Sequence, residues 1–147
     1  MQAETMKAAL RAAGLKPSEI NYVEVAANGM TYSDASELSA LTETFGGQFG
    51  SDKIPLGSVK SNVGHAHVAS AIPQIVKVLM QLKDREIYPF IKADPMNPNL
   101  KFEASPFKLQ RELAPWTPSE AKGNNRCRAL VNSYGLGGSY ASLIIEG

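Results

Sequence analysis

Hydrophobic residues recur at helical spacing in three stretches of the chain. In the first, residues 2–13, one face carries Met6, Leu10 and Ala13. This spacing predicts an amphipathic helix. Gly14 follows directly and predicts its C-terminal end, because glycine adopts the left-handed backbone conformation most easily.

The second stretch has an apolar stripe formed by Leu38, Leu41 and Phe45. Asp34, followed three residues later by Glu37, resembles a capping box with the acid at the N-cap, and it predicts that a helix begins there. Gly46-Gly47 predicts the end of this helix.

The third stretch predicts a longer helix from about residue 66 to residue 83. Pro73 would lie inside it, where a proline kinks or locally unwinds a helix. The face expected to be buried consists of Val68, Ile72, Ile75, Leu79 and Leu82.

Short apolar runs between these helices predict strands. They cover residues 21–25, 55–59, 129–134 and 139–145. The last two flank a glycine-rich turn and predict a hairpin, whereas residues 85–126 hold most of the prolines and predict a long connection. Alternating strands and helices with a final hairpin predict an α/β fold, with a mixed sheet and helices on its faces.

Composition narrows the class of protein further. Fifteen basic and fourteen acidic residues nearly cancel, so no nucleic-acid or membrane partner is expected. The single cysteine, Cys127, excludes an intrachain disulfide, and no metal-ligand spacing is present. We expect Cys127 to be a buried structural thiol. Without an apolar run of about 18 residues, we expect a soluble, cytoplasmic protein.

Candidate chemistry gathers in the segment from Gly57 to His65, at a strand-to-helix junction. Such junctions collect polar side chains in α/β proteins. Lys60, Asn62 and His65 lie here, and we expect His65 at the start of the following helix. The helix dipole there favours neutral imidazole, which can donate a hydrogen bond to an oxyanion. From the residues alone, a structural histidine remains the alternative.

Five segments together resemble the β-ketoacyl synthases, the condensing enzymes of polyketide and fatty-acid synthesis. The sequence KSNVGHAHVASAI, residues 60–72, resembles the family segment KSNxGHxEAAAG. NYVEVAANGM, residues 21–30, stands where the family has YVEAHGTGT, and Asp34 and Glu37 match the GDPIE that follows. Residues 102–116 resemble the F…PF…PW segment, and SYGLGGS, residues 133–139, resembles SFGFGGTNAH. The sequence of these segments is most similar to that of ketosynthase domains of modular polyketide synthases.

This resemblance assigns roles to individual residues. It implies that His65 is the second catalytic histidine of the family and that Lys60 supports the same site. The first histidine falls on Ala26, a degenerate catalytic position, since a methyl group cannot donate a hydrogen bond. The expected substrate contacts are Asn28, Met30, Asn62, Leu136 and Gly137.

The resemblance also implies a larger assembly. Residues 1–147 would form the C-terminal part of a ketosynthase with a thiolase-like fold, and the N-terminal part, which carries the cysteine nucleophile, would be a separate partner. A first strand upstream of Met1 would be missing, so the sheet and a core face would be uncovered. We therefore expect activity only with the N-terminal fragment, as a dimer of heterodimers.

The degenerate position suggests which reaction the assembled domain performs. We expect an acyltransferase of the non-elongating kind, which passes an acyl chain between acyl carrier proteins without decarboxylative condensation. The substrate would ride on the phosphopantetheine of the carrier protein, with no cofactor bound directly. One alternative is an elongating synthase in which Asn28 or the partner supplies the missing group. Another is an inert subunit with an interaction or chain-length role.

Overall fold

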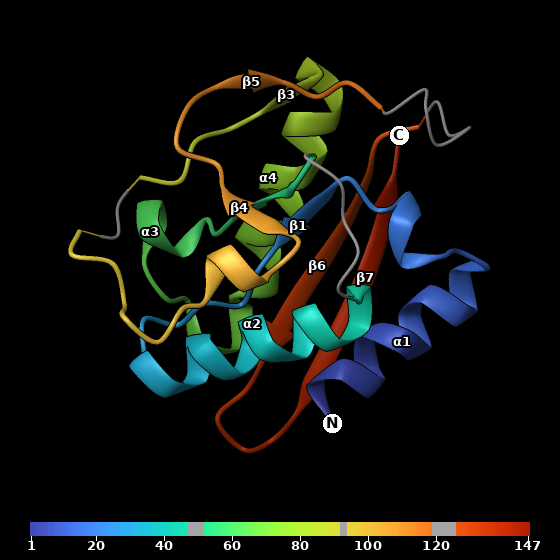
Figure 1. The fold of residues 1–147 in the computed structure, drawn as a ribbon. Helices are drawn as coiled ribbons and strands as arrows, with labels where there is room; N and C mark the ends of the chain where they lie inside the picture. Colours follow the sequence, from blue (N-terminus) through green and yellow to red (C-terminus); the bar gives the residue numbers. More distant parts are fainter. Residues whose placement is uncertain (47–51, 92–93, 119–125) are drawn as a thin grey trace.

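A five-stranded mixed sheet organises the molecule (Figure 1). The computed structural model describes residues 1–46, 52–91, 94–118 and 126–147. The strands are β1 (Tyr22–Glu24), β2 (Ile54–Gly57), β4 (Phe107–Leu109), β6 (Arg128–Tyr134) and β7 (Tyr140–Glu146). Their order is β4-β2-β1-β6-β7, with all neighbours parallel except the β6–β7 hairpin. A separate ladder pairs β3 (Glu86–Ile87) with β5 (Ala114–Pro115).

Helices cover both faces of the sheet. On one face α1 (Gln2–Ala13) and α2 (Thr31–Phe45) pack together, and α4 (Ala71–Asp84) crosses the other face (Figure 1). The short elements are α3 (Lys60–Val63) and three 3₁₀ turns at Pro17–Glu19, His67–Ala69 and Phe102–Ala104. Each face has its own core, because successive β1 residues point to opposite sides: Val23 packs among the α1 and α2 side chains, and Tyr22 packs beside Val78 of α4.

The expected α/β fold with a mixed sheet is confirmed, as are the first helix and the four predicted strands, within two residues at each end. Met6 and Leu10 of α1 are buried, although Ala13 is exposed. Gly14 ends α1 with a φ of 66°, the left-handed conformation that glycine allows without strain. A strand upstream of Met1 stays a prediction.

The predicted start of the second helix is wrong. Helix α2 begins at Thr31, with Met30 at its N-cap, so Asp34 lies in the first turn and Glu37 inside the helix. The capping-box pattern misleads because both acids are used by the preceding loop rather than by the helix end. The end of α2 at Gly46 is confirmed, and Gly47 lies outside the described residues.

The third helix is shorter than its hydrophobic spacing predicts. Positive φ angles at Gly64 (78°) and His67 (49°) break the chain into α3, a 3₁₀ turn and α4, which starts at Ala71. Pro73 therefore lies in the first turn of α4, where its missing N–H has no helical acceptor and causes no kink. The helix ends at Asp84, close to the predicted end.

Burial on α4 differs from the expectation, although Leu82 of the predicted face does pack against the core. The buried residues are Gln74, Lys77, Val78 and Gln81. On the face predicted to be buried, Val68 ahead of the helix is fully exposed, and Ile72 and Leu79 are 64% and 51% exposed. A helix with its polar side against the sheet and its apolar side outward has a second surface still to cover.

The end of β2 should not tolerate a side chain at Gly57. A methyl group there would overlap the Tyr22 hydroxyl and lie 2.9 Å from Lys77 Nζ. We expect Gly57→Ala to lower the free energy of unfolding by about 1–3 kcal/mol, as overpacked cores do. Chemical denaturation measures this. Gly137→Ala, where nothing lies within 4 Å, is the matched control, and equal midpoints for the two variants would contradict the prediction.

Candidate functional site

Three loops meet at one edge of the sheet because β1, β2 and β6 run parallel. Their carboxyl ends lead into residues 25–30, 58–65 and 135–138, which hold every candidate site residue from the sequence. In open α/β sheets, ligands bind outside the carboxyl ends of the strands. The fold therefore brings the three candidate segments to one place.

Lys60 and Ala26 are in direct contact. The Lys60 ammonium donates to the carbonyl oxygen of Ala26 at 2.6 Å, linking α3 to the loop after β1. Partial burial lowers the pKa of Lys60, an effect opposed by the negative charges of Glu37, Glu24 and Asp34. The Lys60 ammonium therefore lies against the loop that carries Ala26, and its role in catalysis stays a prediction.

Glu37 holds the same loop from the other side. Its two carboxylate oxygens accept the N–H groups of Ala26 and Ala27 at 2.9 and 3.0 Å, and Asn132 donates to it at 3.2 Å. Burial raises the pKa of Glu37 despite these hydrogen bonds. The Ala26 backbone is thus fixed at both its N–H and its carbonyl, and its methyl group is buried. Sequence reasoning assigned Glu37 to a helix cap and missed this function.

His65 lies in the loop between α3 and the following 3₁₀ turn, exposed, rather than at a helix start as predicted. Its Nδ1 accepts the N–H of His67 at 3.0 Å and lies 3.2 Å from the Ser70 hydroxyl. Because Nδ1 accepts, the proton of the neutral ring is on Nε2. The expected donor form is therefore produced by a local turn rather than by a helix dipole. Ser70 is buried, and nothing in the sequence pattern indicated that it would contact His65.

The residues expected to contact substrate line the same edge. Asn28 accepts the N–H of Met30 at 3.0 Å through its side-chain oxygen, which leaves its amide nitrogen to donate to a bound molecule. Met30 is 53% exposed, and Leu136 at the hairpin tip is 86% exposed beside Gly137. Asn62, in α3, is exposed and accepts the Ser61 hydroxyl at 2.9 Å.

Cys127 lies away from this edge, just before β6 begins. It is fully buried, with Arg85 Nη1 3.2 Å from its sulfur and the carbonyl of Trp116 3.3 Å away. The prediction of a buried thiol is confirmed. Among the described residues, no group of three or more His, Cys, Asp or Glu side chains could hold a metal ion. Within the same residues, no helix is long and apolar enough to cross a membrane.

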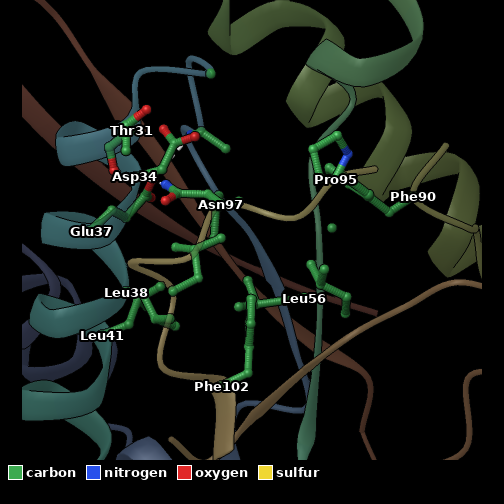
Figure 2. A pocket seen from close by; sticks show the side chains of 16 residues that line it. Thr31, Asp34, Glu37, Leu38, Leu41, Leu56, Phe90, Pro95, Asn97 and Phe102 are labelled. Carbon is green, nitrogen blue, oxygen red and sulfur yellow. Dashed lines mark hydrogen bonds between the residues drawn. The ribbon is translucent and has the colours of Figure 1, made fainter. Parts of the chain in front are cut away.

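A cavity of about 230 Å³ lies under the loop after β1, between α2 on one side and Phe90 and residues 95–102 on the other (Figure 2). Its walls are largely apolar, and Asp34 and Asn97 line it on the α2 side. Burial raises the pKa of Asp34, against hydrogen bonds from the N–H groups of Asn28 and Gly29. Asp34 therefore supports the loop that carries the candidate substrate contacts, as Glu37 does.

The sequence matches one known protein family over more than half of its length. The family profile described as "Beta-ketoacyl synthase, C-terminal domain" matches residues 1–94. The chain belongs to the β-ketoacyl synthase family. It is 43% identical to polyketide synthase PksR of Bacillus subtilis over 151 residues, which covers 99% of the chain and 6% of that protein. Over 147 residues it is 40% identical to polyketide synthase ThaG of Burkholderia thailandensis, covering 99% of the chain and 3% of that protein.

Solved ketosynthases share the fold. The oxazolomycin ketosynthase domain OzmH KS7 of Streptomyces albus superposes with a TM-score of 0.90 at 39% identity, covering 99% of the chain and 26% of that domain. The module 6 ketosynthase of the Bacillus subtilis bacillaene synthase gives 0.88 at 32% identity, with the same coverage. The chain thus corresponds to the C-terminal domain of a modular polyketide synthase ketosynthase, in the C-terminal half of the thiolase-like fold. It spans about a quarter of these structures.

Glu37 should make the stability of the domain depend on pH. Its pKa in the folded state is raised above the ordinary value of 4.5, so proton binding favours the folded state. This stabilisation is complete below pH 4.5 and is lost as the pH rises through the folded pKa. Relative to Glu37→Gln, the wild type should therefore lose free energy of unfolding across that window. Urea unfolding at a series of pH values measures the difference, and a constant difference would contradict the assignment.

Proposed function

We propose that the chain is the C-terminal part of a non-elongating ketosynthase, which moves acyl chains between acyl carrier proteins without forming a carbon–carbon bond. The observation that carries the proposal is Ala26. This residue stands at the position of the first family histidine, its backbone is fixed by Glu37 and Lys60, and its side chain has no proton to donate.

The proposed transfer needs a nucleophile and an oxyanion hole, but not the donors that hold an enolate. A cysteine thiolate on the N-terminal part attacks the acyl thioester, and the tetrahedral oxyanion expels the phosphopantetheine thiolate of the first carrier. The thiolate of the second carrier then attacks the acyl-enzyme and releases the cysteine. The oxyanions are expected to be held mainly by backbone N–H groups near the nucleophile and near Leu136.

Condensation makes a further demand. Decarboxylation of a malonyl thioester places negative charge on the thioester oxygen, and the charge must be held by preorganised donors. His65 offers an Nε2–H here, whereas the donor that the first family histidine would supply is absent at Ala26. Loss of one such donor typically slows a step by about 10²–10³-fold, which favours transfer over condensation.

Two other functions follow from specific features. An elongating synthase remains an alternative because the amide nitrogen of Asn28 could donate in place of the missing histidine. A catalytically inert interaction subunit is the other, and the residue at the nucleophile position of the N-terminal part distinguishes it from both enzymes. A cytoplasmic location remains a prediction from the sequence.

The exposed face of α4 supports the proposed partnership. Ile72, Val76, Leu79 and Met80 are each about half exposed or more, from 48% to 64%. They form a continuous apolar strip on the side of α4 that faces away from the sheet. We propose that the N-terminal ketosynthase part packs on this strip and that the assembled domain dimerises, with acyl carrier proteins as its transient partners.

The reaction should separate into a step that survives and one that fails. With the assembled domain, an acyl carrier and a malonyl carrier, mass spectrometry should detect acyl-enzyme and acyl transfer to a second carrier. It should detect no product longer by two carbons. Restoring the donor with Ala26→His should raise condensation above the wild-type level, because the introduced imidazole and His65 together can hold the enolate.

Two results would count against this reading. Elongated product from the wild type at a rate comparable with loading would favour the elongating alternative, and Asn28→Ala should then abolish it. Absence of acyl-enzyme in an assembled domain that carries the cysteine would favour the inert subunit. Cys127→Ala should leave loading intact, because that thiol is buried away from the site.

Assembly should depend on the apolar strip of α4. Leu79→Lys puts a charge on the strip without disturbing the sheet side of the helix, so co-expression with the N-terminal part should yield little complex by size-exclusion chromatography. Leu113→Lys, at a residue 57% exposed elsewhere, is the matched control. Equal yields of complex from both variants would show that the strip is not the docking surface.

A further inference from the structure

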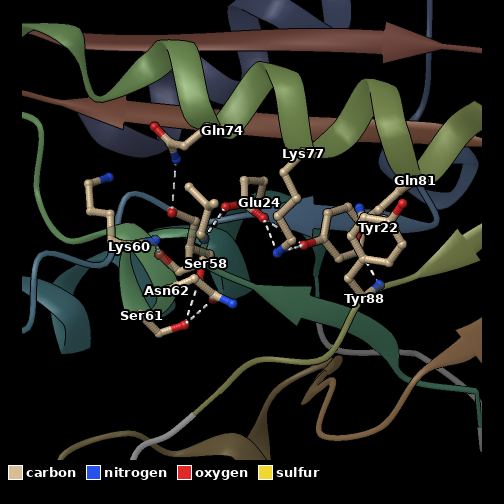
Figure 3. A network of polar contacts seen from close by, with 12 residues as sticks. Tyr22, Glu24, Ser58, Lys60, Ser61, Asn62, Gln74, Lys77, Gln81 and Tyr88 are labelled. Atoms are coloured by element: carbon tan, nitrogen blue, oxygen red, sulfur yellow. Dashed lines mark hydrogen bonds and ion pairs between the residues drawn. The ribbon is translucent and has the colours of Figure 1, made fainter.

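The polar side of α4 places a charged residue inside the protein. Gln74, Lys77 and Gln81 all lie against the sheet and are 0%, 8% and 0% exposed (Figure 3). A buried ammonium group is costly unless a partner compensates its charge. The residues that Lys77 meets therefore indicate what this charge does in the fold.

Lys77 pairs with a carboxylate at the end of β1. Its Nζ lies 2.8 Å from Glu24 Oε2 and 2.8 Å from the Tyr22 hydroxyl, which itself donates to Glu24 Oε2 at 2.6 Å. Glu24 is fully buried. One oxygen of the carboxylate is thus occupied by two donors, and the position of the other oxygen is fixed by the same contacts.

The second oxygen of Glu24 reaches the loop that carries Lys60. Glu24 Oε1 accepts the N–H of Val59 at 2.5 Å, a hydrogen bond to a buried carboxylate. Val59 is the N-cap residue of α3, and the next residue is Lys60, whose ammonium contacts Ala26. The ion pair between Lys77 and Glu24 is therefore connected, through the Val59 N–H, to the residue that contacts Ala26.

Little space exists for this arrangement to relax. A side chain at Gly57, two residues before Val59, would collide with Tyr22 and Lys77. Gln74 strengthens the same connection by donating to the carbonyls of Val25 and Asn132, which follow β1 and lie in β6. Helix α4 thus contacts all three strands whose ends form the site.

We propose that Lys77 is a positioning residue: through Glu24 it holds the Val59–Lys60 turn in the geometry that the site requires. The inference rests on the proposed function, in which Lys60 would hold the loop after β1 that carries the expected substrate contacts Asn28 and Met30. Lys77 itself touches neither substrate nor the reacting atoms. Without the Lys77 ammonium, the negative charge of the buried Glu24 carboxylate would have no compensating cation. The hydrogen bond from the Val59 N–H to this carboxylate would then weaken.

The test uses the assembled ketosynthase with Lys77→Met and, as matched control, Lys83→Met at an exposed position of the same helix. Hydrogen exchange followed by mass spectrometry should show faster exchange in the peptide containing the Val59 amide for Lys77→Met only. Acyl transfer should fall about 10- to 100-fold, in line with the loss of a hydrogen bond to a charged group. Lys77→Met with Glu24→Gln, which removes both charges, should fold if the single variant does not.

A double-mutant cycle with Lys60→Met separates positioning from general destabilisation. If Lys77 acts through Lys60, the double variant Lys60→Met with Lys77→Met should transfer acyl groups no more slowly than Lys60→Met alone. Additive losses, or unchanged exchange around Val59 in Lys77→Met, would overturn the proposal. Suppose that Lys60→Met leaves acyl transfer intact while hydrogen exchange around Val59 accelerates in Lys77→Met. The connection from Lys77 to the Val59 turn is then supported, and the proposed role of Lys60 is contradicted.

Discussion

The buried ion pair between Lys77 and Glu24 is the interaction on which the site depends. It explains why α4 turns its polar side to the sheet, since only that side offers a cation to the carboxylate at the end of β1. A buried pair of this kind adds little stability by itself, but removing one partner is costly, so it specifies one arrangement of helix and sheet. Because the polar side of α4 packs on the sheet, its apolar side is left exposed on this chain.

Most of the fold could be predicted from the sequence, because helical and alternating hydrophobic patterns are local signals. The orientation of α4 could not. Periodicity shows that two faces of a helix differ, but it does not show which of the two packs on the chain's own sheet. Ile72 and Leu79 thus looked like residues that pack on the chain's own sheet, although they point away from it.

The candidate site shows the same division between local and distant information. The motif around Lys60 and His65 predicted the right segment, and the parallel strands bring Ala26, Asn28 and Leu136 to the same edge. The function of Glu37 was missed because an acid that caps a helix and an acid that binds the N–H groups of the preceding loop give the same sequence pattern. Its partners, the N–H groups of Ala26 and Ala27, lie across a loop whose path only the fold defines. Side chains thus fix a backbone at which the expected catalytic group is replaced by a methyl.

We infer that α4 becomes an interior helix in the assembled ketosynthase, with its polar side on this sheet and its apolar side on another protein surface. Met80 reports on that apolar side directly, because it is 50% exposed here and its thioether oxidises when peroxide can reach it. The rate of Met80 oxidation in the assembled ketosynthase should be far below that of Met1, which is 84% exposed on α1's side of the sheet. Similar oxidation rates for Met80 and Met1 would contradict the account.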